Sequence, residues 1–186
     1  MTAVHGDDVA LRARAIRLLT CDVDGVLTDG RLYYHDDGTE LKAFHSLDGV
    51  GLKMLANAGV TIAWITGGSA PAVAHRARAL GIVRLVQGTE DKLAPWEALR
   101  RELGLEAIAC AHIGDDLPDL PIFVRCGFAV CVPHTPSPVR ERTHYVTRAD
   151  GGCGAVREVC DLILAAQDAL APRIASFGRS SAGGRS

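Results

Sequence analysis

The sequence has no long hydrophobic run, no excess of basic residues and few aromatic side chains. Phe, Trp and Tyr make up 5% of the 186 residues, and 20 Lys and Arg face 22 Asp and Glu, for a formal net charge of -2. Binding to a phosphate backbone needs clustered Lys and Arg, so the composition excludes nucleic acid as the main partner. No apolar stretch approaches the ~18 residues of a membrane span, and Asp7 and Asp8 lie where a secretory signal would be apolar. We therefore expect a cytoplasmic protein that does not enter a membrane.

The six cysteines form no Cys-x-x-Cys pair. Most of them lie among aliphatic residues, as Cys110 and Cys131 do, which indicates buried reduced thiols. The seven histidines lack the i, i+3 or i, i+4 spacing of a helical zinc site. We interpret His45, His112 and His144 as structural residues, because phosphoryl transfer of the kind inferred below gives them no role.

Apolar strand-like segments alternate with helix-like segments along most of the chain. Strands are predicted over 16–23, 60–65, 83–86, 107–113, 128–132 and 143–146. Helices are predicted over 48–58, 69–80, 91–103, 117–125 and 154–170. This alternation predicts an α/β fold with a doubly wound, Rossmann-like parallel sheet and helices on both faces.

A β-hairpin is predicted directly after the first strand, because Asp37-Gly38 supplies the backbone freedom of a tight turn. No connection between the predicted elements is long enough to hold an inserted cap domain. We expect residues 1–170 to form a single domain. The segment 171–186 is rich in Gly, Ser and Arg, and we expect it to be a flexible C-terminal tail.

Polar residues follow several predicted strands at the point where each strand ends. Asp22 and Asp24 follow the first strand, Thr66 follows the second, and Asp115 follows the strand 107–113. Lys92 stands at the start of a predicted helix. Ligands in doubly wound folds bind beyond the carboxyl ends of the strands, so we expect these five side chains to meet at one edge of the sheet.

Asp22 and Asp24 are two residues apart, which places both carboxyl groups on one side of an extended chain. Their mutual repulsion in a half-buried site favours a bound cation. Mg²⁺ fits best, because it prefers oxygen ligands and keeps water and substrate phosphate in its shell. Asp115 is the natural third partner, whereas Asp116 and Asp119 fit a helix N-cap and an acidic first turn.

The remaining groups are suited to a phosphoryl dianion. The Thr66 hydroxyl, the Gly67 amide and the Lys92 ammonium can all bind phosphoryl oxygens. The chemistry indicated is phosphoryl transfer. The glycine-rich segment 151–154 ahead of a helix is open to two interpretations, an anion site or a plain glycine turn.

At these residues the sequence resembles the haloacid dehalogenase superfamily of phosphatases. The segment Asp22-Val-Asp-Gly-Val-Leu-Thr-Asp29 resembles motif I, and Gly114-Asp-Asp-Leu-Pro-Asp119 resembles motif IV. Thr66 fits motif II, and Lys92 fits motif III. The motifs occur in the family's order, and the resemblance covers roughly residues 16–170.

Within that superfamily the sequence is similar to the 3-deoxy-D-manno-octulosonate 8-phosphate phosphatases, which act in lipopolysaccharide synthesis. The similar segments are 40–44, 48–51, 145–148 and 151–161. The resemblance implies a capless homotetramer in which the hairpin at 30–45 joins subunits and a neighbour helps to close the active site.

The resemblance also assigns a role to each site residue. Asp22 is the expected nucleophile, which forms an aspartyl-phosphate, and Asp24 is the expected general acid and base. The carboxylates of Asp22 and Asp115 and the backbone carbonyl of Asp24 are expected to hold Mg²⁺. Thr66 and Lys92 are expected to bind and neutralise the transferring phosphoryl group.

The chain departs from the family's usual pattern at three positions where a basic residue is often found. Here these positions hold Gly68, Leu47 and Cys153. From the resemblance we therefore expect the substrate to be the octulosonate 8-phosphate, or else a nonulosonate 9-phosphate or another small sugar phosphate.

Other cations are available to replace the missing basic residues: Arg31, Lys42, Lys53 or the arginines of the tail. A more distant alternative is a receiver-like signalling domain, which also carries a phosphorylated Asp. A receiver has no need of an acid and base at Asp24, and its phosphoaccepting strand follows an earlier acidic pair.

Overall fold

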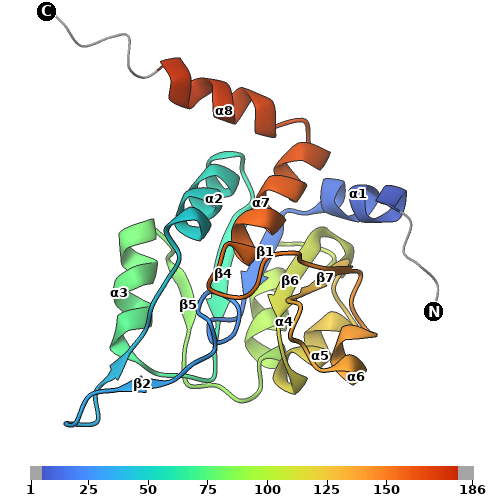
Figure 1. Cartoon of the computed structure of the whole chain (residues 1–186). Helices are drawn as coiled ribbons and strands as arrows, with labels where there is room; N and C mark the ends of the chain where they lie inside the picture. Colours follow the sequence, from blue (N-terminus) through green and yellow to red (C-terminus); the bar gives the residue numbers. More distant parts are fainter. Residues whose placement is uncertain (1–5, 180–186) are drawn as a thin grey trace, which may run out of the picture.

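A six-stranded sheet forms the centre of the structure, a computed structural model that describes residues 6–179 (Figure 1). The strand order is β5-β4-β1-β6-β7-β8, and every neighbouring pair is parallel. The strands are β1 Leu18–Cys21, β4 Thr61–Ile65, β5 Arg84–Val86, β6 Cys110–Gly114, β7 Phe128–Cys131 and β8 Tyr145–Val146. The predicted doubly wound α/β fold is confirmed.

Helices cover both faces of this sheet. One face packs against α1 Gly6–Ala15, α2 Ser46–Asn57, α3 Pro71–Leu80 and α7 Ala155–Ala166. The other face packs against α4 Leu93–Glu102, α5 Leu120–Phe123 and α6 Ser137–Arg140. Short 3₁₀ helices at Ala107–Ala109 and Leu117–Asp119 flank β6, and α8 Leu170–Arg179 follows α7.

Successive side chains of each strand enter opposite cores, because side chains alternate across a sheet. Leu19 and Cys21 of β1 pack in the core under α2 and α7, whereas Leu18 packs in the core under α4 and α5. Trp64 and Ile65 of β4 divide in the same way. Burial on both sides explains the continuous apolar strand sequences, and each such aliphatic side chain contributes about 1.5 to 3 kcal/mol.

A small hairpin projects from the sheet after β1 (Figure 1). It consists of β2 Tyr33–Tyr34 and β3 Glu40–Leu41, which pair antiparallel, with Gly38 at a φ of +82° in the turn. This hairpin lies within the connection between β1 and α2. Within residues 6–179, no connection between elements contains an inserted cap domain, as the sequence predicted.

Two terminal helices differ from the sequence-based expectations. The segment 171–179 was expected to lack regular structure, but it belongs to α8, in which Ile174 and Phe177 recur at helical spacing. Residues 180–186 of the predicted tail lie outside the described residues. The helix α1 was not expected, and Val9 and Ala13 pack its apolar side against the core. No helix in the described part of the chain is long and apolar enough to cross a membrane.

The topology brings the predicted site to the middle of the sheet. From β1 the chain crosses to β4 and β5 on one side and then to β6, β7 and β8 on the other. The carboxyl ends of β1, β4 and β6 therefore lie side by side at the point where the strand order reverses. This position is where doubly wound folds bind ligands.

Candidate active site

A tight turn after β1 places Asp22 and Asp24 at the end of the strand. The amide of Asp22 donates to a carbonyl of β6 at 2.9 Å, and the Val23 carbonyl accepts hydrogen bonds from the amides of residues 26–28. Gly25 adopts a φ of +83° in this turn. A Cβ at Gly25 would lie 2.0 Å from Oδ2 of Asp115, so only glycine lets the turn approach that carboxylate.

Lys92 enters the site from the N-cap position of α4 and is 4% exposed. Its Nζ lies 2.9 Å from Oδ2 of Asp22 and 2.8 Å from Oδ1 of Asp119. Burial lowers the pKa of the Lys92 ammonium, but the charges of Asp119 and Asp22 outweigh burial, so the pKa is raised. The structure thus places a fixed positive charge beside the predicted nucleophile.

Asp119 is the buried carboxylate that holds Lys92 in place. Its Oδ1 contacts Lys92 and lies 2.9 Å from Nε2 of His112, and its Oδ2 accepts from the amides of Asp115 and Asp116. Burial raises the pKa of Asp119, but the His112 hydrogen bond and charge, together with Lys92, outweigh it and hold the pKa at about 2. Asp119 therefore positions Lys92 in addition to the predicted capping role, which the capping box with Asp116 bears out.

His112 is fully buried and acts as a structural partner of Asp119. Its Nδ1 lies 2.8 Å from the Thr20 hydroxyl, and its ring packs against Phe123. A structural role was expected for His112, but its partner Asp119 was not, because His112 is a single polar residue within an apolar strand. The alternation of side chains along β6 could have indicated which core His112 faces, since Ala111 and Ile113 face one core and His112 faces the other.

The carboxylates of the site fit a divalent cation. One oxygen each from Asp22, Asp115 and Asp119 lie within 4.8 Å of one another. Burial and the charge of Asp119 raise the pKa of Asp22 to about 7 and that of Asp115 to about 6. Carboxylates crowded in this way are stabilised in their charged form by a hard cation such as Mg²⁺. The backbone carbonyl of Asp24 remains a predicted ligand.

Asp24 is held by a lysine of the hairpin. Nζ of Lys42 donates to Oδ1 of Asp24 at 2.5 Å, and the Lys42 side chain is 2% exposed. Burial lowers the pKa of Lys42, but hydrogen bonds to Asp24 and Glu40 outweigh it, so the pKa is raised. From the sequence, Lys42 was expected only as a replacement cation, because its position along the chain does not show that its side chain reaches the end of β1.

Thr66 lies at the end of β4 and is 1% exposed. Its Oγ1 accepts a hydrogen bond from the Gly68 amide at 3.2 Å, which shapes the Thr66-Gly67-Gly68 turn. A Cβ at Gly68 would lie 3.1 Å from Oδ2 of Asp24. The structure therefore brings Thr66, Asp24, Asp22, Lys92 and Asp115 to one edge of the sheet, as predicted.

The glycine-rich segment 151–154 packs against the turn after β1. The Gly152 amide donates to the Val26 carbonyl at 2.9 Å, and a Cβ at Gly151 would lie 1.8 Å from the Gly25 carbonyl oxygen. The close approach of the two backbones thus explains why position 151 is glycine. At position 152 a φ of +66° is a second reason for glycine. The segment therefore supports the turn that carries Asp22 and Asp24.

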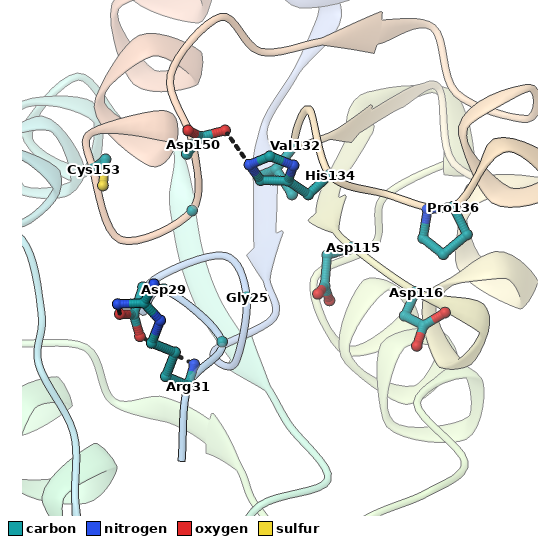
Figure 2. A pocket seen from close by; sticks show the side chains of 12 residues that line it. Gly25, Asp29, Arg31, Asp115, Asp116, Val132, His134, Pro136, Asp150 and Cys153 are labelled. Atoms are coloured by element: carbon teal, nitrogen blue, oxygen red, sulfur yellow. Dashed lines mark hydrogen bonds and ion pairs between the residues drawn. The ribbon is translucent and has the colours of Figure 1, made fainter. Parts of the chain in front are cut away.

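A pocket of about 550 Å³ opens beside the site (Figure 2). Among the predicted metal and catalytic residues, only Asp115 lines it. Its wall includes Gly25, Asp29, Arg31, Asp116, His134, Asp150 and Cys153. His134 and Asp150 are joined across its rim at 3.2 Å (Figure 2). The pocket meets the acidic cluster at Asp115, so a substrate held in it would touch the edge of the site.

The candidate replacement cations differ in availability. Lys42 forms ion pairs with Asp24 and Glu40, and Lys53 lies exposed on α2. Arg31 lines the pocket with 78% of its side chain exposed, and its contact with Asp29 is a loose 3.9 Å. Of the tail arginines, Arg173 donates to the Asn57 carbonyl, whereas the Arg179 side chain and Arg185 lie outside the described residues. Arg31 is therefore the cation best placed to meet a substrate.

The chain is similar to several known proteins along most of its length. It is 48% identical over 164 residues, 88% of each chain, to the 3-deoxy-D-manno-octulosonate 8-phosphate phosphatase of Yersinia pestis. The phosphatase of that name from Moraxella catarrhalis, crystallised with magnesium, phosphate and KDO, superposes with a TM-score of 0.91. The two proteins are 45% identical in sequence, and the superposition covers 93% of this chain and 99% of the other.

A putative haloacid dehalogenase superfamily hydrolase from Legionella pneumophila is 43% identical, with a TM-score of 0.89 over 93% of this chain and 95% of its own. No family model matches the chain. The fold and the acidic site at the end of β1 define a phosphatase of the haloacid dehalogenase superfamily. More narrowly, the chain belongs to the family of 3-deoxy-D-manno-octulosonate 8-phosphate phosphatases.

Proposed function

We propose that this protein hydrolyses 3-deoxy-D-manno-octulosonate 8-phosphate to the free sugar acid and phosphate, with Mg²⁺, as a step in lipopolysaccharide precursor synthesis. The family membership supports the substrate, and the Moraxella catarrhalis relative was crystallised with magnesium, phosphate and KDO. The observation that carries the proposal for this chain is the buried cluster in which Lys92 bridges Asp22 and Asp119 beside Asp115.

In the first step a carboxylate oxygen of Asp22 attacks phosphorus, and the bond to the sugar oxygen breaks. Asp24 donates a proton to that leaving oxygen, and Asp22 becomes an aspartyl-phosphate. Lys92, already 2.9 Å from Asp22, and the buried Thr66 hydroxyl bind the phosphoryl oxygens. A preorganised cation is effective here because catalysis of phosphoryl transfer depends mainly on positioning and charge stabilisation.

In the second step a water molecule attacks the phosphorus of the aspartyl-phosphate. Asp24, now ionised, takes a proton from that water, the bond between phosphorus and Asp22 breaks, and phosphate leaves. Both carboxyl groups return to their starting states. Asp24 is 31% exposed on its side chain, whereas Asp22 is 8% exposed, so water and the leaving sugar can reach the acid and base more easily than the nucleophile.

Asp22, Asp115 and the backbone carbonyl of Asp24 would hold the Mg²⁺. When bound, the ion neutralises the crowded carboxylates and the phosphoryl charge. Asp119 contributes an oxygen to the same cluster, but its hydrogen bonds to Lys92 and His112 occupy it.

Arg31 is the cation that supports recognition of an acidic sugar in this chain, since it lines the pocket and is mostly exposed. A nonulosonate 9-phosphate is a second candidate substrate. The observation that favours it is the absence of basic side chains at Gly68, Leu47 and Cys153, because Leu47 is half exposed and Cys153 lines the pocket without adding a charge there.

The hairpin supports association with further copies of this chain, and we propose a homotetramer. Apolar side chains on and before the hairpin are exposed in the single chain, among them Leu32, Tyr34 and Leu41. Surfaces of this kind mark interfaces between proteins. The six cysteines are free, and five of them are buried, which supports a reducing compartment such as the cytoplasm.

The test is phosphate release with Mg²⁺ from a panel of 3-deoxy-D-manno-octulosonate 8-phosphate, nonulosonate 9-phosphates and hexose phosphates. Asp22→Asn serves as the blank. Strong preference for the octulosonate supports the proposal. Preference for a nonulosonate 9-phosphate would change the proposed substrate but not the proposed mechanism. Activity that survives in Asp22→Asn would overturn the mechanism.

A further inference from the structure

Lys42 joins the hairpin to the predicted acid and base of the reaction. Its ammonium lies 2.5 Å from Oδ1 of Asp24 and 2.5 Å from Oε1 of Glu40. Its side chain is 2% exposed, although β2 and β3 on either side of the hairpin turn are largely exposed. An ammonium removed from water in this way requires paired carboxylates, so its location is specific.

The local sequence explains how the side chain reaches Asp24. Glu40 and Lys42 are two residues apart in an extended segment, so both side chains lie on the same side of the chain. Glu40 therefore holds one flank of the ammonium while Asp24, 18 residues earlier, holds another. Two oppositely charged partners restrict the rotation of a flexible lysine that would otherwise sample many rotamers.

This contact leaves the two oxygens of Asp24 in different surroundings. Oδ1 accepts the hydrogen bond from Lys42. Oδ2 faces the turn after β4, since a Cβ at Gly68 would lie 3.1 Å from Oδ2 and 3.6 Å from Oγ1 of Thr66. The second oxygen thus lies beside the Thr66-Gly67-Gly68 turn, which carries the hydroxyl that is proposed to bind the phosphoryl group.

We propose that Lys42 is a positioning residue that fixes the Asp24 carboxyl with Oδ2 directed at the reacting oxygens. Held in this orientation, Oδ2 gives its proton to the leaving sugar oxygen and later takes one from water. The inference rests on the proposed function, because it assigns Lys42 a part in the step that Asp24 performs. Precise orientation of an acid and base accounts for much of the effect of such groups.

The test compares two leaving groups in the first turnover. A sugar alkoxide needs a proton in order to leave, whereas the p-nitrophenolate of p-nitrophenyl phosphate does not. Rapid-quench measurement of the octulosonate ester and stopped-flow measurement of p-nitrophenolate report the first step for each substrate. We expect Lys42→Met to slow the sugar phosphate by about 30-fold or more and the aryl phosphate by less than about 5-fold.

Three further variants separate orientation from folding. Lys42→Arg restores a cation and is expected to recover the sugar-phosphate rate to within about 10-fold of wild type. Glu40→Gln loosens the hairpin without removing Lys42 from Asp24, and it should slow both substrates equally and slightly. Arg84→Met, which removes a cation from a surface pair with Glu102, is the matched control and should leave both rates unchanged.

An equal loss on both substrates in Lys42→Met would show that Lys42 only supports the fold and would overturn the inference. Unchanged rates on both substrates would overturn it as well. Failure of the proposed function is recognised separately, because wild-type protein would then release no phosphate that depends on Asp22. Circular dichroism and melting temperature confirm that each variant is folded before rates are compared.

Discussion

The α-carbon of Gly25 faces the carboxylate of Asp115 so closely that a Cβ built at position 25 would lie 2.0 Å from Oδ2. The two residues come from turns after β1 and β6 that are 90 positions apart in the sequence. This contact limits how closely the turn after β1 can approach the Asp115 carboxylate. It also makes the geometry of the site sensitive to a single methyl group.

Gly25→Ala is therefore expected to lower phosphatase activity by about 100-fold or more, since a misplacement near 1 Å costs catalysis on that scale. The matched control is Gly81→Ala at the end of α3, where φ is +75° and nothing lies within 4 Å of the added carbon. It carries the backbone strain without the clash. We expect it to retain full activity and to lose about 1 kcal/mol of stability in urea unfolding. Equal activities in the two variants would refute the close-approach explanation.

Replacement of Asp22, the proposed nucleophile, separates the effect on catalysis from the effect on folding. Asp22→Asn should reduce phosphate release at least about 1000-fold, because no carboxylate remains to form the covalent intermediate. It should not lower the melting temperature measured without metal, since burial and the charge of Asp119 already disfavour an ionised Asp22. Asp24→Asn is expected to lose activity nearly as completely. Phosphate release by Asp22→Asn near the wild-type rate would contradict the assignment.

Mg²⁺ should stabilise the folded protein as well as activate it. A ligand present at 100 times its Kd adds about 2.7 kcal/mol to the free energy of unfolding. We expect chelation by EDTA to abolish turnover and Mg²⁺ to raise the melting temperature. Asp115→Asn should remove this rise. Asp116→Asn is the control, because Asp116 is exposed and caps the following 3₁₀ helix, and it should keep the rise.

Arg31→Ala is expected to raise KM for the octulosonate ester by about 5- to 100-fold, the range of a charge-assisted contact of 1 to 3 kcal/mol. The value of kcat should change little, since Arg31 lines the pocket and contacts none of the reacting groups. A hexose phosphate without a carboxylate should show no change in KM. Steady-state kinetics on both esters distinguish loss of carboxylate recognition from general damage to the pocket.

Glu158 should make stability depend on pH. Its carboxylate accepts hydrogen bonds from the Tyr145 hydroxyl at 2.6 Å and from the amides of Arg148 and Ala149. Burial raises its pKa, but these hydrogen bonds outweigh burial and leave the pKa lowered. A lowered pKa stabilises the fold above the carboxyl's unfolded value, and this stability is lost as pH falls through the folded value.

The corresponding variant is Glu158→Gln. It should lose about 1 to 2 kcal/mol of unfolding free energy at pH 7 and progressively less below pH 4.5, as the wild-type carboxyl becomes protonated. Glu102→Gln is the matched control, because Glu102 is 66% exposed in a surface pair, and it should change stability by less than about 0.5 kcal/mol. Urea unfolding at several pH values makes the comparison. A Glu158→Gln deficit that does not shrink with falling pH would contradict the assignment.

The sheet could be predicted from the sequence because its four central strands, β4, β1, β6 and β7, are largely buried and consist mostly of consecutive apolar residues. Polar residues also begin where several strands end, as at Asp22, and this pattern located the candidate site. The helix α1 gave a weaker signal, because charged residues interrupt its few apolar positions. In α8 the apolar side chains Ile174 and Phe177 stand among Gly, Ser and Arg, which made the segment resemble a tail.

The contacts that could not be predicted are those between side chains from distant elements. Lys42 reaches Asp24 only because the hairpin folds back toward the end of β1. Asp119 binds both Lys92 and His112. The three residues belong to separate elements, and their positions in the sequence do not indicate that they meet. Local patterns determine elements and strand ends, whereas such pairings depend on the path of the chain in three dimensions.

The position of β1 between β4 and β6 has a consequence for biosynthesis. Asp22 leaves the ribosome before its site is complete, because its strand gains its second neighbour only when Gly114 has emerged, and the supporting segment 151–154 comes later still. Pairings between distant parts of a chain form late in folding. A nascent chain therefore carries Asp22 long before it can use it, and we expect hydrolysis only after the segment 151–154 has been synthesised.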